Sequence, residues 1–180
     1  MQYDARRKEL VMAQERKHIE ATLLFPITPT KVGLGLKKQK VGAGLLNGWG
    51  GVVEAGESPL TCIGREVFEE GGVRVDLETL TKVAVMLFHN EKFDCRVHTY
   101  LAPWHYEPLQ ETAEMGAQTW YPRTKPPIHR MMAADRIWVP KILAGNCVRG
   151  EAWYGPEQKQ LVGRGCVIDY VRPHQLNDLH

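Results

Sequence analysis

Three glutamates, Glu66, Glu69 and Glu70, have the type and spacing to bind a metal ion. Offsets of three and four residues place side chains on one face of a helix. Like charges at that spacing destabilise a helix by about 0.2–0.5 kcal/mol per pair. A divalent cation such as Mg²⁺ offsets the repulsion and keeps positions open for phosphate oxygens. The cluster therefore predicts metal-assisted phosphate chemistry, with a solvated acidic helix face as the simpler alternative.

The flanking residues define the helix that carries this cluster. Ser58 is a good N-cap, and Pro59 suits the first helical position. Gly71 and Gly72 supply a left-handed stop. The sequence therefore predicts a helix over 59–70, which packs through apolar residues at helical spacing: Leu60, Ile63 and Val67.

A glycine-rich loop over 37–56 precedes the helix. Glycines let the backbone turn sharply and approach a ligand closely. Arg65 points to a different part of the helix circumference from Glu66. We expect its guanidinium to clamp a carboxylate, for example that of Glu57, and so to fix the loop to the helix.

The rest of the chain predicts a mixed sheet covered by helices. A charged and apolar pattern over 4–20 indicates an N-terminal surface helix. The elements expected after it are a hairpin over 21–27 and 31–36, strands at 82–88, 96–101 and 119–121, a short helix at 138–144, and two apolar runs at 148–154 and 161–170. No repeat or linker interrupts them, so one α/β domain is expected.

Composition and charge exclude several classes. Of 180 residues, 43% are hydrophobic and 24% charged, as in an ordinary globular domain. A formal charge of +2 is too balanced for a protein that lives on nucleic-acid backbones, so no polymer partner is expected. The four cysteines show no zinc or disulfide spacing. Without an apolar run of signal-peptide or membrane-span length, a cytoplasmic protein is expected.

Residues 51–73 resemble the signature of the Nudix hydrolases. The signature is glycine, five residues, glutamate, seven residues, Arg-Glu, an aliphatic residue, any residue, Glu-Glu, any residue, glycine and an aliphatic residue. The matching positions are Gly51, Glu57, Arg65, Glu66, Val67, Glu69, Glu70, Gly72 and Val73. The preceding stretch over 42–51, GAGLLNGWGG, is similar to the MutT-type branch of the family, and the likeness covers roughly residues 21–172.

The resemblance implies a fold and a reaction. The fold is an α/β/α sandwich around a mixed β-sheet, with residues 1–20 as an extra helical extension, 21–172 as the hydrolase domain and 173–180 as a tail. The reaction is Mg²⁺-dependent attack of water on a nucleoside triphosphate, which releases monophosphate and pyrophosphate; Mn²⁺ is the alternative cation. Oxidised purine nucleotides such as 8-oxo-dGTP are the implied substrates. Activity should require the cation and mildly alkaline pH.

The resemblance also assigns roles to individual residues. Metal ligands fall on Glu66 and Glu70, with Glu69 beside them, and on the carbonyl of Gly50. Glu114 matches an acidic position across the site that holds a second metal or helps to deprotonate water. The residues expected to contact the nucleotide are Lys37 at the triphosphate, Thr22, Asn47 and Asp135 at the base, and Phe88 in the pocket wall. The simpler alternatives are a solvated lysine, a turn asparagine and a core aromatic residue.

Two departures from the branch bear on substrate choice. Where the branch carries adjacent acidic residues, this chain has Ala134-Asp135, and Met132 replaces a stacking tryptophan. The changes leave hydrolysis untouched but bear on which base is preferred. The alternatives are hydrolysis of a dinucleotide or nucleotide sugar, and nucleotide sensing without turnover. In each case we expect a small-molecule nucleotide partner, no membrane, and a monomer or small homo-oligomer.

Overall fold

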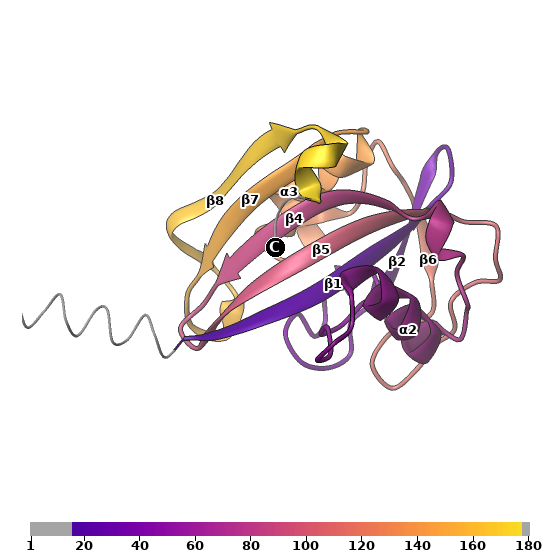
Figure 1. The fold of residues 1–180 in the computed structure, drawn as a ribbon, viewed down its shortest axis with the longest axis horizontal. Coiled ribbons are helices and arrows are strands. Elements are labelled where there is room, and N and C mark those ends of the chain that lie inside the picture. The colour runs from indigo at the N-terminus through magenta and orange to yellow at the C-terminus, as the bar shows by residue number, and fades with distance from the viewer. Residues whose placement is uncertain (1–15, 178–180) are drawn as a thin grey trace, which may run out of the picture.

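The computed structural model describes residues 16–177 (Figure 1). The strands are β1 (Lys17–Ile27), β2 (Lys31–Leu36), β3 (Leu46–Asn47), β4 (Thr81–His89), β5 (Phe93–Pro103), β6 (Thr119–Pro122), β7 (Cys147–Tyr154) and β8 (Leu161–Val171). The described helices are α2 (Pro59–Gly71) and α3 (Asp135–Leu143), with 3₁₀ turns η1 (Leu77–Thr79), η2 (Ile128–Arg130), η3 (Pro156–Gln158) and η4 (Pro173–Leu176).

The strands pair in one mixed sheet, in the order β3-β2-β1-β5-β4-β7-β8, with β6 beside β2. β1 and β2 form the predicted antiparallel hairpin. β1 runs parallel to β5, with Lys17 opposite Phe93 and Ile27 opposite Pro103, and β4 runs parallel to β7. The predicted strands at 82–88, 96–101 and 119–121 all lie within observed strands. The mixed α/β sheet is therefore confirmed.

The two helices cover opposite faces of this sheet. Successive residues of a strand point to opposite faces. In β1, Leu24 accordingly packs in one hydrophobic cluster with Ile63 and Val67 of α2, whereas Phe25 packs in another with Trp138 of α3. Figure 1 shows α2 in front of β1. The arrangement confirms the expected α/β/α sandwich.

Helix α2 begins and ends almost where its sequence predicts. The Ser58 side chain accepts a hydrogen bond from the Thr61 backbone N–H, and Pro59 occupies the first helical position. Gly72 adopts φ 77°, and its N–H donates to the Phe68 carbonyl. This left-handed residue satisfies a carbonyl at the helix end. Because both ends are fixed, the glutamates of α2 are held in a defined register toward the sheet.

Some predicted boundaries are wrong. Residues 17–20, expected to close an N-terminal helix, instead begin β1, because their backbone pairs with 93–96 of β5. Residues 4–15 of that expected helix lie outside the described residues. Helix α3 begins at Asp135 rather than at 138, so that Asp135 lies in its first turn. In the expected C-terminal tail, η4 folds back and buries Leu176.

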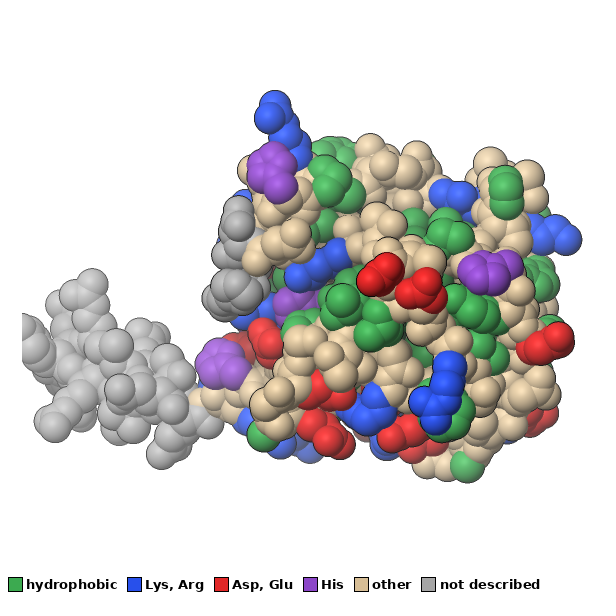
Figure 2. Space-filling view, turned by 45° about the vertical axis from the view of Figure 1, so that its right-hand side comes forward, with side chains coloured by type: hydrophobic (Ala, Val, Ile, Leu, Met, Phe, Trp, Pro, Cys, Tyr) green, Lys and Arg blue, Asp and Glu red, His purple; other side chains and the backbone are tan. Residues whose placement is uncertain are grey.

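The described surface shows neither a membrane helix nor a charge of one sign. Across residues 16–177, no helix has both the length and the apolar content to cross a bilayer. On the face seen in Figure 2, basic and acidic side chains are interspersed. This distribution agrees with the nearly balanced composition of the chain.

Candidate active site

A cleft with a volume of about 700 Å³ brings most of the predicted site residues together. The predicted residues on its wall are Thr22, Lys37, Asn47, Gly50, Glu66, Glu70, Phe88, Glu114 and Asp135. They come from β1, β3, α2, β4, α3 and the loops between them. Glu57, Arg65 and Glu69 are not part of the lining and connect to it through ion pairs.

Two glutamates of α2, Glu66 and Glu70, face the cleft. Glu70 is only 9% exposed, and its Oε2 accepts a hydrogen bond of 3.0 Å from the Gly50 N–H. Burial raises the pKa of both carboxyl groups; for Glu70 the Gly50 N–H and the charge of Lys37 act in the opposite direction. Because burial disfavours the charged forms, a nearby positive charge stabilises both carboxylates. The predicted ligand role of the Gly50 carbonyl stays a prediction.

Arg65 organises the acidic face of α2. Its Nε and Nη2 donate to the two carboxylate oxygens of Glu57, each at 3.0 Å, which is the clamp expected from the sequence. This bidentate contact lowers the pKa of Glu57. Its Nη1 also contacts Glu66 at 2.8 Å and Glu69 at 3.1 Å. The Glu69 side chain is 57% exposed and does not line the cleft, and its predicted metal-binding role stays a prediction.

Glu114 approaches the cleft from a loop across the site. Both of its carboxylate oxygens accept from Lys40 Nζ, at 3.1 and 3.0 Å. The backbone of the loop is tied to the glycine-rich segment, because Lys38 N–H donates to the Glu114 carbonyl at 2.9 Å. Lys37 lies on the same segment and lines the cleft beside Glu70. The cleft therefore has acidic groups on two sides and basic groups near both.

A second group of cleft residues surrounds Asp135. Its Oδ1 accepts from Trp138 Nε1 at 3.0 Å, and its side chain is almost fully buried. Burial raises the pKa of Asp135 to about 7. Phe88 pairs with Tyr154, their ring centroids 6.2 Å apart, and both line the cleft. A buried carboxyl group that shares a cleft with aromatic rings is suited to a flat ring that offers hydrogen-bonding edges.

Thr22 and Asn47 line the cleft but also have structural contacts. The Thr22 hydroxyl lies 3.3 Å from Cys62 Sγ and 3.4 Å from the Gly51 carbonyl. Asn47 Oδ1 accepts from the Gly48 N–H at 2.9 Å, as expected of a turn residue. The Asn47 Nδ2 makes no hydrogen bond to any of residues 16–177, so it is free to donate into the cleft. The turn role and the predicted binding role are thus compatible.

Several cleft residues escaped the sequence analysis as site residues. They include Trp138, Tyr154 and Gln158. Trp138 and Tyr154 look like core residues in the sequence, and both are indeed buried. Lys40 and Gln158 have positive φ angles of 59° and 55°, and sequence patterns do not predict such angles for lysine or glutamine.

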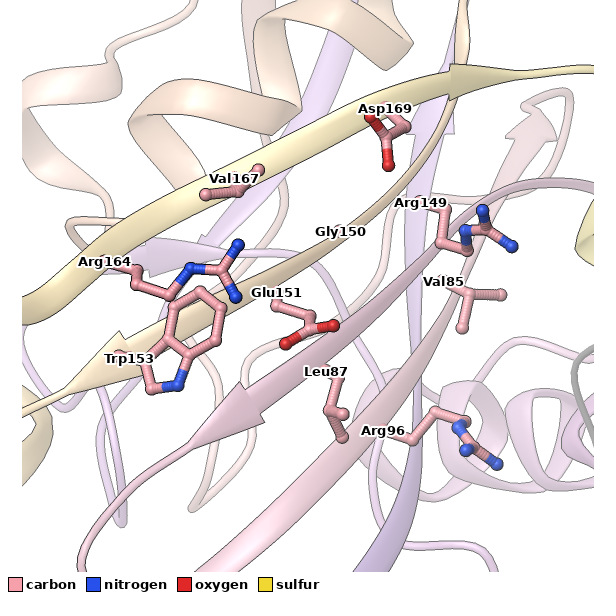
Figure 3. Close-up of a pocket in the computed structure, with 10 residues that line it drawn as sticks. All are labelled: Val85, Leu87, Arg96, Arg149, Gly150, Glu151, Trp153, Arg164, Val167 and Asp169. Carbon is pink, nitrogen blue, oxygen red and sulfur yellow. The ribbon is translucent and has the colours of Figure 1, made fainter.

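A smaller cavity of about 260 Å³ lies on the solvent side of β4, β7 and β8 (Figure 3). Its labelled residues include Arg96, Arg149 and Arg164. Trp153 lines the cavity. Its ring stacks on the His89 ring, and the Arg164 guanidinium lies over it. None of the predicted site residues lines this cavity. The predicted chemistry therefore belongs to the larger cleft.

The donor set of the larger cleft fits a hard divalent cation. Among residues 16–177 no three carboxylate, imidazole or thiol groups converge as a complete metal site. Two of the predicted ligands are engaged in ion pairs, Glu66 with Arg65 and Glu114 with Lys40. Glu66 and Glu70 nevertheless offer oxygen donors in an open cleft, where a positive charge would offset the effect of burial on both carboxyl groups. Mg²⁺ commonly takes one or two carboxylates and completes its shell with water and phosphate oxygens.

Comparisons with known proteins agree with this geometry. The NUDIX domain model matches residues 4–142. The chain is 37% identical over 126 residues to the oxidized purine nucleoside triphosphate hydrolase of Danio rerio, which covers 68% of this chain and 78% of that protein. The protein of the same name from Mus musculus is 36% identical over the same shares.

Solved structures of MutT proteins share the fold. The protein from Bacillus halodurans superposes with a TM-score of 0.68 at 23% identity, covering 84% of this chain and 97% of that chain. The MutT NUDIX hydrolase from Burkholderia pseudomallei gives a TM-score of 0.62 at 19% identity, with 71% and 99% covered. With the domain match, the curated relatives and the carboxylate-lined cleft in agreement, the chain belongs to the Nudix family.

Proposed function

We propose that this protein hydrolyses purine nucleoside triphosphates, oxidised ones such as 8-oxo-dGTP included, to monophosphate and pyrophosphate, and so clears damaged nucleotides from the pool. One observation carries the proposal: a single cleft joins the Glu66 and Glu70 carboxylates to the buried Asp135 and its aromatic neighbours. The triphosphate part of a nucleotide requires carboxylates that can hold a cation, and the base requires polar and aromatic side chains such as those around Asp135. The curated relatives at 37% and 36% identity, named for this activity, support the choice of substrate.

Glu66 and Glu70, with Glu114 opposite, would hold the divalent cation, Mg²⁺ or Mn²⁺. Held by these carboxylates, such a cation would supply neutralisation of phosphate charge and activation of the attacking water. The protein's own part is positioning. Arg65 fixes Glu66 relative to the loop that carries Glu57, and the Gly50 N–H fixes the Glu70 carboxylate. Phosphoryl transfer depends mostly on such positioning and on charge stabilisation.

Basic side chains supply the remaining charge at the phosphate end. Lys37 lines the cleft, and its charge already acts on Glu70. A lysine ammonium binds phosphate as a point charge, without the fixed geometry of arginine. Lys37 therefore attracts the polyphosphate and leaves its exact alignment to the other groups.

Base recognition falls to Asp135 and Asn47. The Asn47 amide donates, and the Asp135 carboxyl group accepts when ionised or donates when protonated. A base that leaves such a buried polar group unpaired is disfavoured by about 1–3 kcal/mol. Met132 and Phe88 provide the apolar contact on the cleft wall.

Turnover measured side by side on normal and oxidised purine triphosphates with Mg²⁺ tests the proposal. We expect pyrophosphate release, with the oxidised nucleotide preferred. Preference for a nucleotide sugar or a dinucleotide over every purine triphosphate would contradict it. Binding without release of phosphate or pyrophosphate across a broad panel would identify a nucleotide sensor instead. A cytoplasmic location and a monomeric or small homo-oligomeric state remain part of the proposal.

A further inference from the structure

Lys40 has a backbone conformation that its residue type disfavours. Its φ is 59°, and in residues 16–177 only Lys40, Glu157 and Gln158 combine a side chain with a positive φ. Glycines occupy the next two such positions of the loop, Gly42 and Gly44. Strained residues of this kind persist where the surroundings hold them, and they cluster at functional sites. Two of the three, Lys40 and Gln158, line the cleft.

The loop of Lys40 is anchored to the loop of Glu114 by contacts outside the cleft. Lys38 N–H donates to the Glu114 carbonyl at 2.9 Å, and Gln39 Nε2 donates to the Ala113 carbonyl at 3.0 Å. Lys38 Nζ contacts Glu111 and the Thr112 carbonyl. These bonds fix the two loops together, so the Lys40 side chain is not required to join them.

The Lys40 side chain instead occupies the oxygens that a cation would need. Its Nζ contacts both carboxylate oxygens of Glu114, at 3.1 and 3.0 Å, and lies in the field of Glu66 and Glu70. We propose that Lys40 is a positioning residue that holds Glu114 at the cleft and, once Glu114 turns to a bound cation, moves to the polyphosphate. The inference rests on the proposed function, because it takes Glu114 as a ligand and a polyphosphate as substrate.

The exchange predicts opposite effects on two ligands. Lys40→Met removes both the competitor for Glu114 and a phosphate contact. Mn²⁺ alone, titrated calorimetrically, should bind about two- to fivefold more tightly, which is the range of an exposed ion pair. A non-hydrolysable purine triphosphate with Mg²⁺ should bind about two- to fivefold more weakly by the same measure. A merely structural lysine would weaken both ligands or neither.

Three further variants make the test specific. Lys40→Arg keeps the positive charge of the side chain and should retain the wild-type affinities for Mn²⁺ and for the triphosphate. Lys40→Gly should reproduce the shifts of Lys40→Met and raise Tm by about 2–4 °C, because it relieves the positive φ. Lys38→Met removes a comparable ion pair outside the cleft, but the Lys38 N–H keeps its bond to the Glu114 carbonyl and Gln39 keeps its bond to Ala113, so Mn²⁺ affinity should stay unchanged.

Unchanged or weaker Mn²⁺ binding in Lys40→Met, or an equal shift in Lys38→Met, would overturn the role of Lys40. If the wild-type protein bound Mn²⁺ but turned over no purine triphosphate, the proposed function would fail. The calorimetric titrations with Mn²⁺ alone would still show whether Lys40 competes with the metal ion for Glu114.

Discussion

Replacing Gly51 with alanine should separate catalysis from folding. A Cβ at this position would lie 2.4 Å from the Glu66 carboxyl group, whereas ordinary contact begins at 3.4 Å. The carboxyl group must therefore move by about 1 Å, and a displacement of that size can reduce a rate by about 100-fold. Gly51 does not have a positive φ, and the obstructing atoms end a flexible side chain. We thus expect turnover to fall about 100-fold while unfolding free energy changes by less than about 1 kcal/mol.

Gly64→Ala provides the matched control. Gly64 lies on α2, the helix that carries Glu66. Its added Cβ would meet the end of the Leu77 side chain at 2.7 Å, away from the cleft. Turnover of this variant should stay within about twofold of wild type. The assay is pyrophosphate release with Mg²⁺, next to thermal unfolding of each variant. Near wild-type turnover in Gly51→Ala, or loss of activity only in step with loss of folded protein, would refute the reasoning.

Three other changes test separate parts of the site. Glu70→Gln keeps the acceptor for the Gly50 N–H but loses the charge, so turnover should fall at least about 100-fold with a modest change in nucleotide affinity. Unaltered turnover would show that Glu70 has no role in the reaction. Asn47→Ala should change the ratio of rates on different purine triphosphates, whereas an equal loss on all would leave only the turn role. Burial raises the pKa of Asp135 from 3.8 to about 7, so its contribution to stability is complete below about pH 4 and is lost as the pH rises to about 7. Asp135→Asn should therefore flatten the fall in Tm over that interval, and a slope like that of wild type would contradict the burial of the charge.

The sequence predicts the helix of the site better than the cleft around it. Ser58, Pro59 and Gly72 act on their immediate neighbours, so local chemistry is enough to place both ends of α2. The contact between Arg65 and Glu57 also connects nearby residues and was predictable from side-chain chemistry. The family resemblance supplied the rest of the predicted cleft residues.

Long-range contacts explain what the sequence could not supply. Residues 17–20 carry a pattern compatible with a helix, but pairing with β5 decides their conformation. Lys40 meets Glu114 across 74 residues, and its positive φ has no signal in a lysine. Tyr154 and Trp138 are buried core residues that also face the cleft, and only the packed structure reveals the second role.

The parallel pairing of β1 with β5 has a consequence for biosynthesis. Partners such as Glu20 and Arg96 are 76 residues apart, and α2 lies between them in the chain. At translation speeds of about 5–20 residues per second, β1 leaves the ribosome about 4–15 s before its partner. During that interval Leu24 and Phe25 have no completed sheet to bury them. The strand against which α2 packs therefore stays without its β5 partner for several seconds in the nascent chain, within reach of a chaperone or an aggregation partner.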